Sequence, residues 1–373
     1  MYPKYHHRWA LVALAATPLC AAQTFTSCNP LEKTCAADVG LPQWEVYTDF
    51  TSGSAAFNRW NTTAGKVEST SLGAKFTISE QGDAPTIESD FYIFFGRVEV
   101  NMKAANGTGI ISTTVMESDD LDEIDWEQIS TYDSSIQTNY FGKGNTTLYN
   151  RDTTVSVTSP EEEFHTYTVD WTSERIEWLL DGKLVRTLEY ADALNGQNYP
   201  QTPMRIKIGI WAGGDPSNAQ GTITWAGGET DYTTGPFTMY VDSVRVLNYN
   251  PASAYTYSDK TGAYTSIKAT NSTTSNDKAL SSAIVKAANA SSSIVSGSTS
   301  SSSSVSRSAI TATHVSSRTS LPVTAVATAS TASVSPSSSP STSSTPVSAA
   351  PATSLVSAGV TLILTMMAAL LLL

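Results

Sequence analysis

Three carboxylates alternate along one short run of the chain, Asp122-Glu123-Ile124-Asp125-Trp126-Glu127. In an extended strand successive side chains point to opposite faces, so Glu123, Asp125 and Glu127 share one face and the two apolar residues between them share the other. Three acids in a row repel one another, which raises the pKa of at least one of them. A retaining glycosidase needs one ionised carboxylate as nucleophile and one protonated carboxyl as general acid. The run therefore predicts a catalytic or ligand-binding surface.

The geometry of the run sets a condition on the strand that carries it. Residues four apart on a flat strand have Cα atoms roughly 13 Å apart, whereas the two carboxyls of a retaining pair lie about 5–5.5 Å apart. Catalysis by Glu123 and Glu127 therefore requires a bent strand on a concave sheet. An acidic solvated strand edge and a calcium site are the alternatives, although the run lacks the glycine of an EF-hand loop. The chain has no phosphate loop, zinc motif or dinucleotide fingerprint, so we predict no metal and no cofactor.

Short alternating runs rich in β-branched and aromatic residues fill the chain from Trp44 to Asn250. Residues 96–103, 165–171 and 205–211 read as strands, and Asp181-Gly182 joins 175–180 to 183–186 as a hairpin. No long helical periodicity is present. About 200 residues of this kind predict an all-β fold, a β-jelly-roll sandwich of two antiparallel sheets with an extended concave face.

The two ends of the 373-residue chain read as targeting segments. Residues 1–22 have a basic start, an apolar stretch and small residues before a cut after Ala22, which predicts a secretory signal peptide rather than a short buried helix. The last residues, 355–373, carry no charge. We therefore expect residues 348–373 to be a removed GPI-anchor signal, with the glycolipid on a small residue such as Ser348, and a retained single-span anchor is the alternative. Either way the protein is extracellular, at the cell surface and the plasma membrane.

Composition separates a folded domain from a stalk. Residues 251–350 hold 47 Ser and Thr and three aromatic residues, so we predict a disordered, O-glycosylated Ser/Thr-rich stalk over 251–347 and a folded domain over 23–250. That domain has 14 basic and 32 acidic residues. Such acidity argues against nucleic-acid binding, which needs a basic surface.

Cysteines and glycosylation sequons fit a secreted glycoprotein. Once the signal is removed, Cys28 and Cys35 remain, and an oxidising compartment favours a disulfide between them over zinc ligation. Five Asn-x-Ser/Thr sequons predict N-glycosylation at Asn61, Asn106, Asn145, Asn271 and Asn289.

The acidic run resembles the Glu-x-Asp-x-Glu signature of glycoside hydrolase family 16, and the resemblance extends over about residues 28–247. The runs 28–35, 209–215 and 221–228 are similar to the Crh branch of fungal cell-wall transglycosylases. That resemblance implies a concanavalin-like β-jelly roll on a GPI anchor, which cuts chitin and joins the new end to β-glucan or chitin. It assigns Glu123 as nucleophile, Glu127 as acid/base in contact with substrate, and Asp125 as the auxiliary carboxylate between them.

Two other functions stay open at this point. One is a plain retaining endo-hydrolase of the same fold, a chitinase or β-glucanase, and the other is a lectin-like wall adhesin without catalysis. For the transglycosylase we expect a chitin donor and a β-glucan acceptor as partners, cell-wall biogenesis as the role, and a monomer.

Sugar binding is predicted from aromatic and polar residues near the acids. Alternation over 205–211 puts Lys207 and Trp211 on one face, so Trp211 is the candidate for stacking on a GlcNAc ring and Lys207 for hydrogen bonding to it. Thr222, on the strand expected to follow 205–211, and Tyr140 are further candidates, and core packing is the alternative for Trp211. We interpret the remaining aromatic, histidine and acidic residues as structural, with Trp171, Trp178, Trp225 and His165 in packing roles and Glu117, Asp119, Asp120 and Asp122 as loop or solvated charges.

Overall fold

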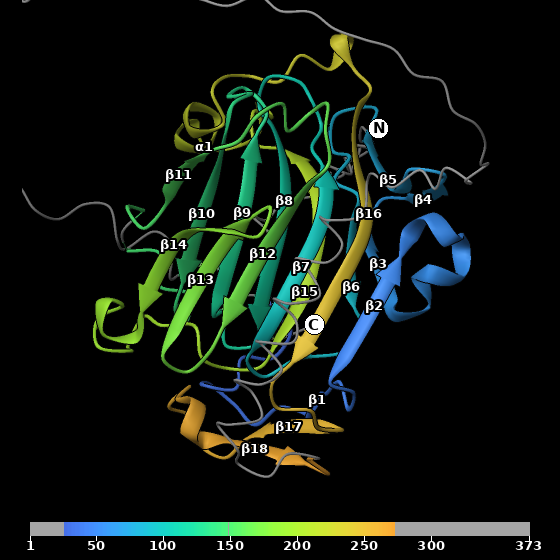
Figure 1. Cartoon of the computed structure of the whole chain (residues 1–373). Helices are drawn as coiled ribbons and strands as arrows, with labels where there is room; N and C mark the ends of the chain where they lie inside the picture. The colour runs from blue at the N-terminus through green and yellow to red at the C-terminus, as the bar shows by residue number, and fades with distance from the viewer. Residues whose placement is uncertain (1–25, 148, 273–373) are drawn as a thin grey trace, which may run out of the picture. The chain divides into compact units, whose positions relative to one another are not determined.

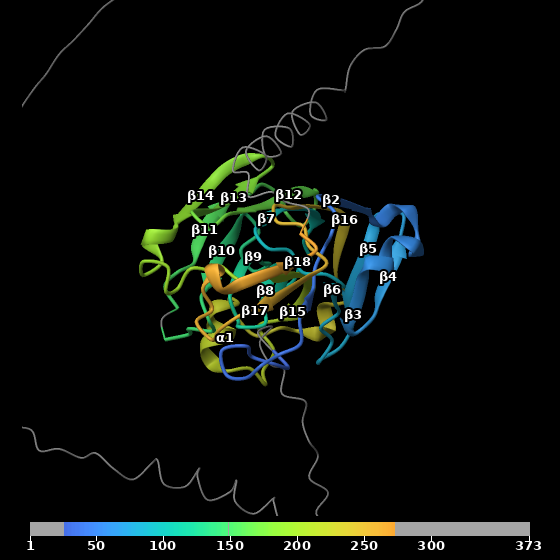
Figure 2. The ribbon, with the colours of Figure 1, turned by 90° about the horizontal axis from the view of Figure 1, so that it is seen from below.

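The computed structural model describes residues 26–147 and 149–272. The predicted signal peptide, the stalk beyond residue 272, the anchor signal, Asn289 and Ser348 lie outside the described residues. Two antiparallel sheets stack face to face, and Figure 2 shows them as two layers. The jelly-roll sandwich predicted from the alternating runs is confirmed.

The first sheet has seven strands and carries the acidic run. Its order is β11 (Thr153–Ser156), β10 (Ser135–Phe141), β9 (Glu123–Ile129), β8 (Ile110–Ser118), β15 (Met204–Ala212), β6 (Thr86–Ser89) and β3 (Trp60–Ala64). Strand β8 is buried at every position. Its core side packs toward the second sheet. On its other side, its side chains lie between those of β9 and β15.

The second sheet has eight strands and covers the other side of the core (Figure 1). Its order is β14 (Lys183–Glu189), β13 (Arg175–Leu180), β12 (His165–Trp171), β7 (Gly96–Lys103), β16 (Phe237–Asn248), β5 (Gly73–Ile78) and β4 (Val67–Thr70), with β2 (Glu45–Asp49) also paired to β16. The hairpin between β13 and β14 has the predicted turn, because Asp181 and Gly182 both have positive φ, 51° and 76°.

Large aromatic side chains fill the space between the sheets. Trp126, Trp171 and Trp178 are fully buried, as are Tyr167 and Phe76. Truncating such a side chain costs about 3–5 kcal/mol. Two of the indoles also satisfy the backbone of the opposite layer: Trp178 Nε1 donates to Asp125 O at 3.0 Å and Trp126 Nε1 donates to Thr168 O at 3.2 Å. The predicted packing roles of Trp171 and Trp178 are confirmed.

A third, small sheet extends the folded part beyond the predicted boundary at residue 250. Strands β17 (Ala254–Tyr257) and β18 (Ile267–Thr270) pair with β1 (Asp38–Val39) and lie across the end of the sandwich (Figure 2). The start of the stalk at 251 is therefore wrong. Composition misled because this sheet needs no core of its own: Tyr255 is fully buried against Phe94, with ring centroids 5.8 Å apart.

Short helices complete the described part. The α-helix is α1 (Gln220–Trp225), and the 3₁₀ turns are η1 (Phe50–Ser52), η2 (Ser54–Arg59), η3 (Tyr190–Asp192), η4 (Tyr232–Thr234) and η5 (Tyr264–Ser266). The strand expected around Thr222 is wrong, because one helical turn lets Ile223 and Ala226 pack inward where alternation would point them apart. Cys28 and Cys35 form a disulfide, with Cα atoms 5.9 Å apart. No helix in the part of the chain that the structure describes is long and apolar enough to cross a membrane.

Candidate active site

Strand β9 presents the three carboxylates on the face of the seven-stranded sheet that points away from the core. Its opposite face is anchored by Ile124 and Trp126, both fully buried. Cross-strand register places Glu117 of β8 opposite Glu123, and Gln137 of β10 opposite Glu127. Directly opposed residues of antiparallel strands point to the same face. The predicted alternation is thus realised, and more groups share the face than the run itself supplies.

Burial and neighbouring negative charges raise the pKa of each acid. Asp125 is 1% exposed and Glu123 is 9% exposed, whereas Glu127 is half-buried. Burial, followed by the charges of Glu117 and Glu127, raises the pKa of Glu123 to about 8. Burial and the charge of Asp152 raise the pKa of Glu127 to about 7. The three groups titrate as a unit that retains protons near neutral pH.

Asp125 lies in the middle of the row and is the most buried of the three acids. No N–H or hydroxyl donor among the described residues reaches either of its carboxyl oxygens. Burial and the neighbouring charge of Glu123 raise its pKa well above the ordinary aspartate value. A hydrogen bond between the two side chains lowers the pKa of Glu123 and raises that of Asp125. A protonated Asp125 that donates to an ionised Glu123 accounts for both directions.

A cluster of charged side chains lies next to the row, and the sequence did not predict it. Glu117 is only 4% exposed and forms an ion pair with Lys207, which also lies 3.6 Å from Glu88 on β6. Arg205 pairs with the same Glu88. Glu117 raises the pKa of Glu123, and Lys207 lowers it. The interpretation of Glu117 as a loop charge is wrong, because it occupies the strand neighbouring β9.

A cavity of about 590 Å³ opens beside the carboxylates, over β8, β15, β6 and β3. Its wall next to β9 includes Thr113 and Glu117, the cross-strand neighbours of Glu127 and Glu123. The predicted binding residues Lys207, Trp211 and Thr222 all line it.

Besides Glu117, the cavity is lined by four charged or aromatic residues that the sequence did not single out as ligand contacts, namely Glu88, Tyr92, Asp119 and Arg205. Arg205 lies 4.5 Å above the Tyr92 ring, and the Tyr92 hydroxyl donates to Asp119 at 2.7 Å. Asp119 is therefore no solvated loop charge. Alternation along 205–211 already placed Arg205 on the cleft face, but nothing in the sequence brings residues 88–119 to that strand.

A second cavity, of about 640 Å³, lies beyond the other side of the carboxylates, around the end of β9, β10, β11 and α1. It includes Gln137 and Trp225, whose indole donates to the Gln137 side-chain oxygen at 2.9 Å. The Trp225 ring stacks on Trp211 with centroids 6.0 Å apart and planes 24° apart. Trp225 is thus half-buried at the cleft rather than in the main core. Recesses flank β9 on both sides.

Tyr140 does not lie in the cleft, and the prediction that it binds substrate is wrong. It pairs with Ile124, so it points to the core side, and it is 7% exposed. It packs there with Arg186, whose guanidinium lies 5.6 Å from the ring centre. His165 is structural, as expected, because it lies on β12 and contacts Asp181 and Thr158 O, both at 2.8 Å.

The described residues contain no group of three or more His, Cys, Asp or Glu side chains placed to hold a metal ion. Of the predicted glycosylation sites, Asn61, Asn106 and Asn271 are exposed and Asn145 is half-buried.

A row of buried, proton-retaining carboxylates on the open face of an antiparallel sandwich defines a glycosidase site. Residues 54–227 match glycosyl hydrolases family 16. The chain is 61% identical over 264 residues to Crh-like protein 1 of Aspergillus fumigatus, covering 71% of each, and 58% identical over 269 residues to Crh-like protein 5 of the same organism, covering 72% of this chain and 67% of the relative. The chain belongs to glycosyl hydrolases family 16 and is one of its Crh-like members.

A solved structure described as Crh5 transglycosylase in complex with NAG is similar as well. It has 58% sequence identity and a TM-score of 0.64, and the match covers 65% of this chain and 99% of that one. The unliganded form of the same transglycosylase matches at 59% identity with the same TM-score.

Proposed function

We propose that this protein is a retaining transglycosylase that cleaves chitin and transfers the enzyme-bound chain to a β-glucan or chitin acceptor. The observation that carries the proposal is the row Glu123, Asp125 and Glu127 on one face of β9, with a cavity on each side. Similarity to a transglycosylase solved with NAG supports the donor sugar.

The first step uses both glutamates. Glu127 donates its proton to the glycosidic oxygen while the Glu123 carboxylate attacks the anomeric carbon, so the glycosidic bond breaks and an ester to Glu123 forms. Burial and neighbouring charges raise the pKa of both glutamates, to about 8 for Glu123 and about 7 for Glu127, so the pair retains protons near neutral pH. Positive charge that develops at the anomeric carbon favours an ionised Glu123, because it lies against that carboxylate in the transition state.

Asp125 and Lys207 favour the reactive protonation state. Both lower the pKa of Glu123, the first through a hydrogen bond and the second through its charge. In the second step Glu127, now ionised, takes the proton of an acceptor hydroxyl, whose oxygen displaces Glu123 from the sugar. Asp125 releases no proton in either step and acts by orienting its neighbour.

Transfer competes with hydrolysis at the second step. A hydroxyl held against the glycosyl-enzyme has a large effective concentration, so a formed acceptor site wins over water. The cavities on both sides of β9 could hold donor and acceptor chains at once. Trp211 and Trp225 provide a pair of stacked indoles between them for sugar rings.

The same proposal covers the ends of the chain. Residues 1–22 act as a secretory signal, residues 348–373 as a removed GPI signal with Ser348 as attachment site, and the Ser/Thr-rich part as an O-glycosylated stalk that begins after residue 272 rather than at 251. The catalytic domain works as a monomer at the cell surface and wall, with N-glycans on the sequon asparagines.

The test incubates the full chain with chitin oligosaccharides and a fluorescently labelled β-glucan oligosaccharide. Labelled products heavier than the acceptor are expected. Shorter chitin fragments without labelled transfer would mean a hydrolase, and sugar binding without any conversion would mean an adhesin. The matched control is Glu123→Gln, which should bind chitin oligosaccharide and give neither product.

A further inference from the structure

Two buried aspartates occupy the turn that leads from β8 into the catalytic strand. Asp120 and Asp122 are both fully buried, and Asp122 directly precedes Glu123. The turn is closed on itself, because Ser118 N donates to Asp122 O at 3.0 Å and Asp122 N donates to Ser118 Oγ at 2.9 Å. Both aspartates are loop residues, as one of the two predicted alternatives had it, but they are not solvated. They have no part in the reaction described above.

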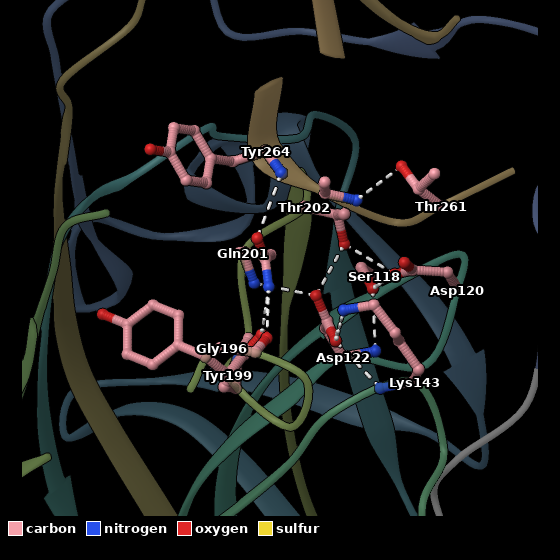
Figure 3. Close-up of polar contacts among 12 residues, drawn as sticks. Ser118, Asp120, Asp122, Lys143, Gly196, Tyr199, Gln201, Thr202, Thr261 and Tyr264 are labelled. Atoms are coloured by element: carbon pink, nitrogen blue, oxygen red, sulfur yellow. Dashed lines mark hydrogen bonds and ion pairs between the residues drawn. The ribbon is translucent and has the colours of Figure 1, made fainter. Parts of the chain in front are cut away.

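Asp122 ties this turn to two distant loops, as Figure 3 shows. Its Oδ1 accepts the Lys143 backbone N–H at 2.9 Å and lies 3.6 Å from Lys143 Nζ. Its Oδ2 accepts the Gln201 backbone N–H at 2.7 Å. The side chain therefore fixes the position from which β9 starts.

The hydroxyl of Thr202 joins the two acids. Thr202 Oγ1 lies 2.6 Å from Asp120 Oδ1 and 3.0 Å from Asp122 Oδ2 (Figure 3). A hydroxyl has one proton to donate, so both contacts are hydrogen bonds only when one of the two carboxyls is protonated and donates to Thr202. The geometry thus accommodates one shared acid proton in the pair. Burial raises the pKa of both groups, to about 7 for Asp122, where the charge of Asp120 adds to it.

The C-terminal extension closes over this pair. Gly262, with a φ of 63°, passes so near that a Cβ there would lie 2.6 Å from Asp120 Oδ2. The Tyr264 backbone N–H donates to the Gln201 side chain at 3.2 Å. Water is therefore kept from the acids by a segment that follows the sandwich.

Three more ionisable groups surround the pair, each from a different segment. Lys143 is its cation, and its charge lowers the pKa of both aspartates. Asp38 on β1 is buried and Tyr257 on β17 is half-buried, and the charge of Asp120 raises the pKa of each.

We propose that Asp120, Thr202 and Asp122 form a proton-bridged clamp that positions the nucleophile Glu123, and that the C-terminal extension is needed to keep the clamp closed. Loss of the shared proton places two negative charges about one hydroxyl and pushes the turn apart. The clamp acts through Glu123 and touches no substrate, so its three members are positioning residues. The proposal rests on Glu123 being the nucleophile of the proposed reaction.

The decisive experiment compares Thr202→Val with Thr202→Ser in the full chain. Valine keeps the shape and removes the hydroxyl, whereas serine keeps the hydroxyl and removes a methyl group. We expect kcat on chitin oligosaccharides to fall about ten- to a hundredfold for Thr202→Val, with KM little changed, because a small displacement of a reacting group is costly. Thr202→Ser should stay within about threefold of wild type.

A buried aspartate of the other sheet controls for general destabilisation. Asp170→Asn disturbs a comparable buried network of Arg97, Arg175 and Tyr249 and should leave kcat unchanged at a temperature where it is folded. The clamp would be overturned if Thr202→Ser lost more kcat than Thr202→Val, or if both variants kept the wild-type kcat. It would also be overturned if Asp170→Asn lost as much kcat as Thr202→Val.

A second measurement needs no activity and covers the case in which Thr202→Val fails to fold. The pKa of Asp122 is raised when folded, so the pair's stabilisation is complete below the unfolded value near 3.8 and is lost as pH rises through about 7. Asp120→Asn supplies permanent amide hydrogens to Thr202, so its unfolding midpoint should fall less than that of wild type between pH 4 and 7. An unchanged pH slope would refute the shared proton. A wild-type chain that converts no β-glycan would instead overturn the proposed function and leave this measurement valid.

Discussion

Asp170 in the eight-stranded sheet and Asp125 in the seven-stranded sheet are equally buried, at 1% exposure. Asp170 has three partners, the guanidinium groups of Arg97 and Arg175 at 3.4 and 3.2 Å and the Tyr249 hydroxyl at 3.1 Å. Asp125 has no such donor among the described residues, and its pKa is raised well above the ordinary value. Burial alone therefore does not mark a functional acid; burial without a compensating donor or cation does.

The two sheets therefore differ in how they treat their buried acids. The eight-stranded sheet satisfies its buried charges and lends hydrogen-bond donors to its neighbour, as Trp178 does to the backbone of Asp125. The seven-stranded sheet keeps acids that repel one another on its open face. A strained site of this kind persists because the rest of the fold stabilises it.

The largest expected effect comes from Glu123→Gln, which removes the proposed nucleophile and one repelling charge together. Turnover of chitin oligosaccharides should fall by more than about a thousandfold. The folded pKa of Glu123 is about 8, so wild type loses stability as pH rises from about 4.5 to 8, and the variant should lose less. Thermal unfolding at pH 4.5 and 7.5 measures this. Full activity, or a variant less stable than wild type at pH 7.5, would contradict the contrast between the sheets.

Asp170→Ala tests the eight-stranded sheet, in which buried charges are paired. It should lower stability and leave activity nearly unchanged. Removing one partner of a buried ion pair costs about 3 kcal/mol or more, because Arg97 and Arg175 lose a counter-ion. Denaturant unfolding should show that loss, while kcat at 20 °C stays within about twofold of wild type. A hundredfold loss of kcat in the folded variant would show that the two sheets are not separable in this way.

The sequence alone predicted the features that depend on neighbouring residues. Alternation correctly put Glu123, Asp125 and Glu127 on one face, and Asp181-Gly182 predicted a hairpin, because strand pleat and turn torsion depend on neighbouring residues. The same alternation misassigned the segment around Thr222, where packing of one helical turn overrode a β-branched pattern.

Long-range pairing was beyond reach of the sequence alone. Glu88, Glu117 and Lys207 meet because β8 and β6 flank β15, and no local signal fixes that order. Tyr140 was misplaced because its register with Ile124 was unknown. The extension past residue 250 was missed because a small sheet can share a neighbour's core.

Glu117→Gln sharpens the comparison by changing a charge beside the nucleophile without touching the row. The charge of Glu117 raises the pKa of Glu123, so its removal should move the limb of the kcat/KM profile that reports Glu123 to lower pH. Lys207→Met is the matched variant of opposite sign, because the lysine lowers the same pKa, and the same limb should move to higher pH. Shifts in the same direction would mean that the limb does not report Glu123.

The smallest expected effect is that of Asp152→Asn, an exposed acid whose charge reaches the other catalytic glutamate. Asp152 raises the pKa of Glu127, so the variant should lose the general-acid proton at lower pH, and the limb of the kcat/KM profile that reports Glu127 should move to lower pH. Asp192→Asn is the control, since Asp192 is also exposed but its charge acts on Tyr140. Because an exposed charge is screened by salt, the Asp152 shift should shrink between low and high ionic strength, whereas the position of the Glu117 limb should depend on salt much less. Equal salt sensitivity of the two limbs would mean that the buried charge of Glu117 is screened as much as the exposed charge of Asp152. Burial would then not determine how a charge acts in the active site, and the contrast drawn from Asp125 and Asp170 would not hold there.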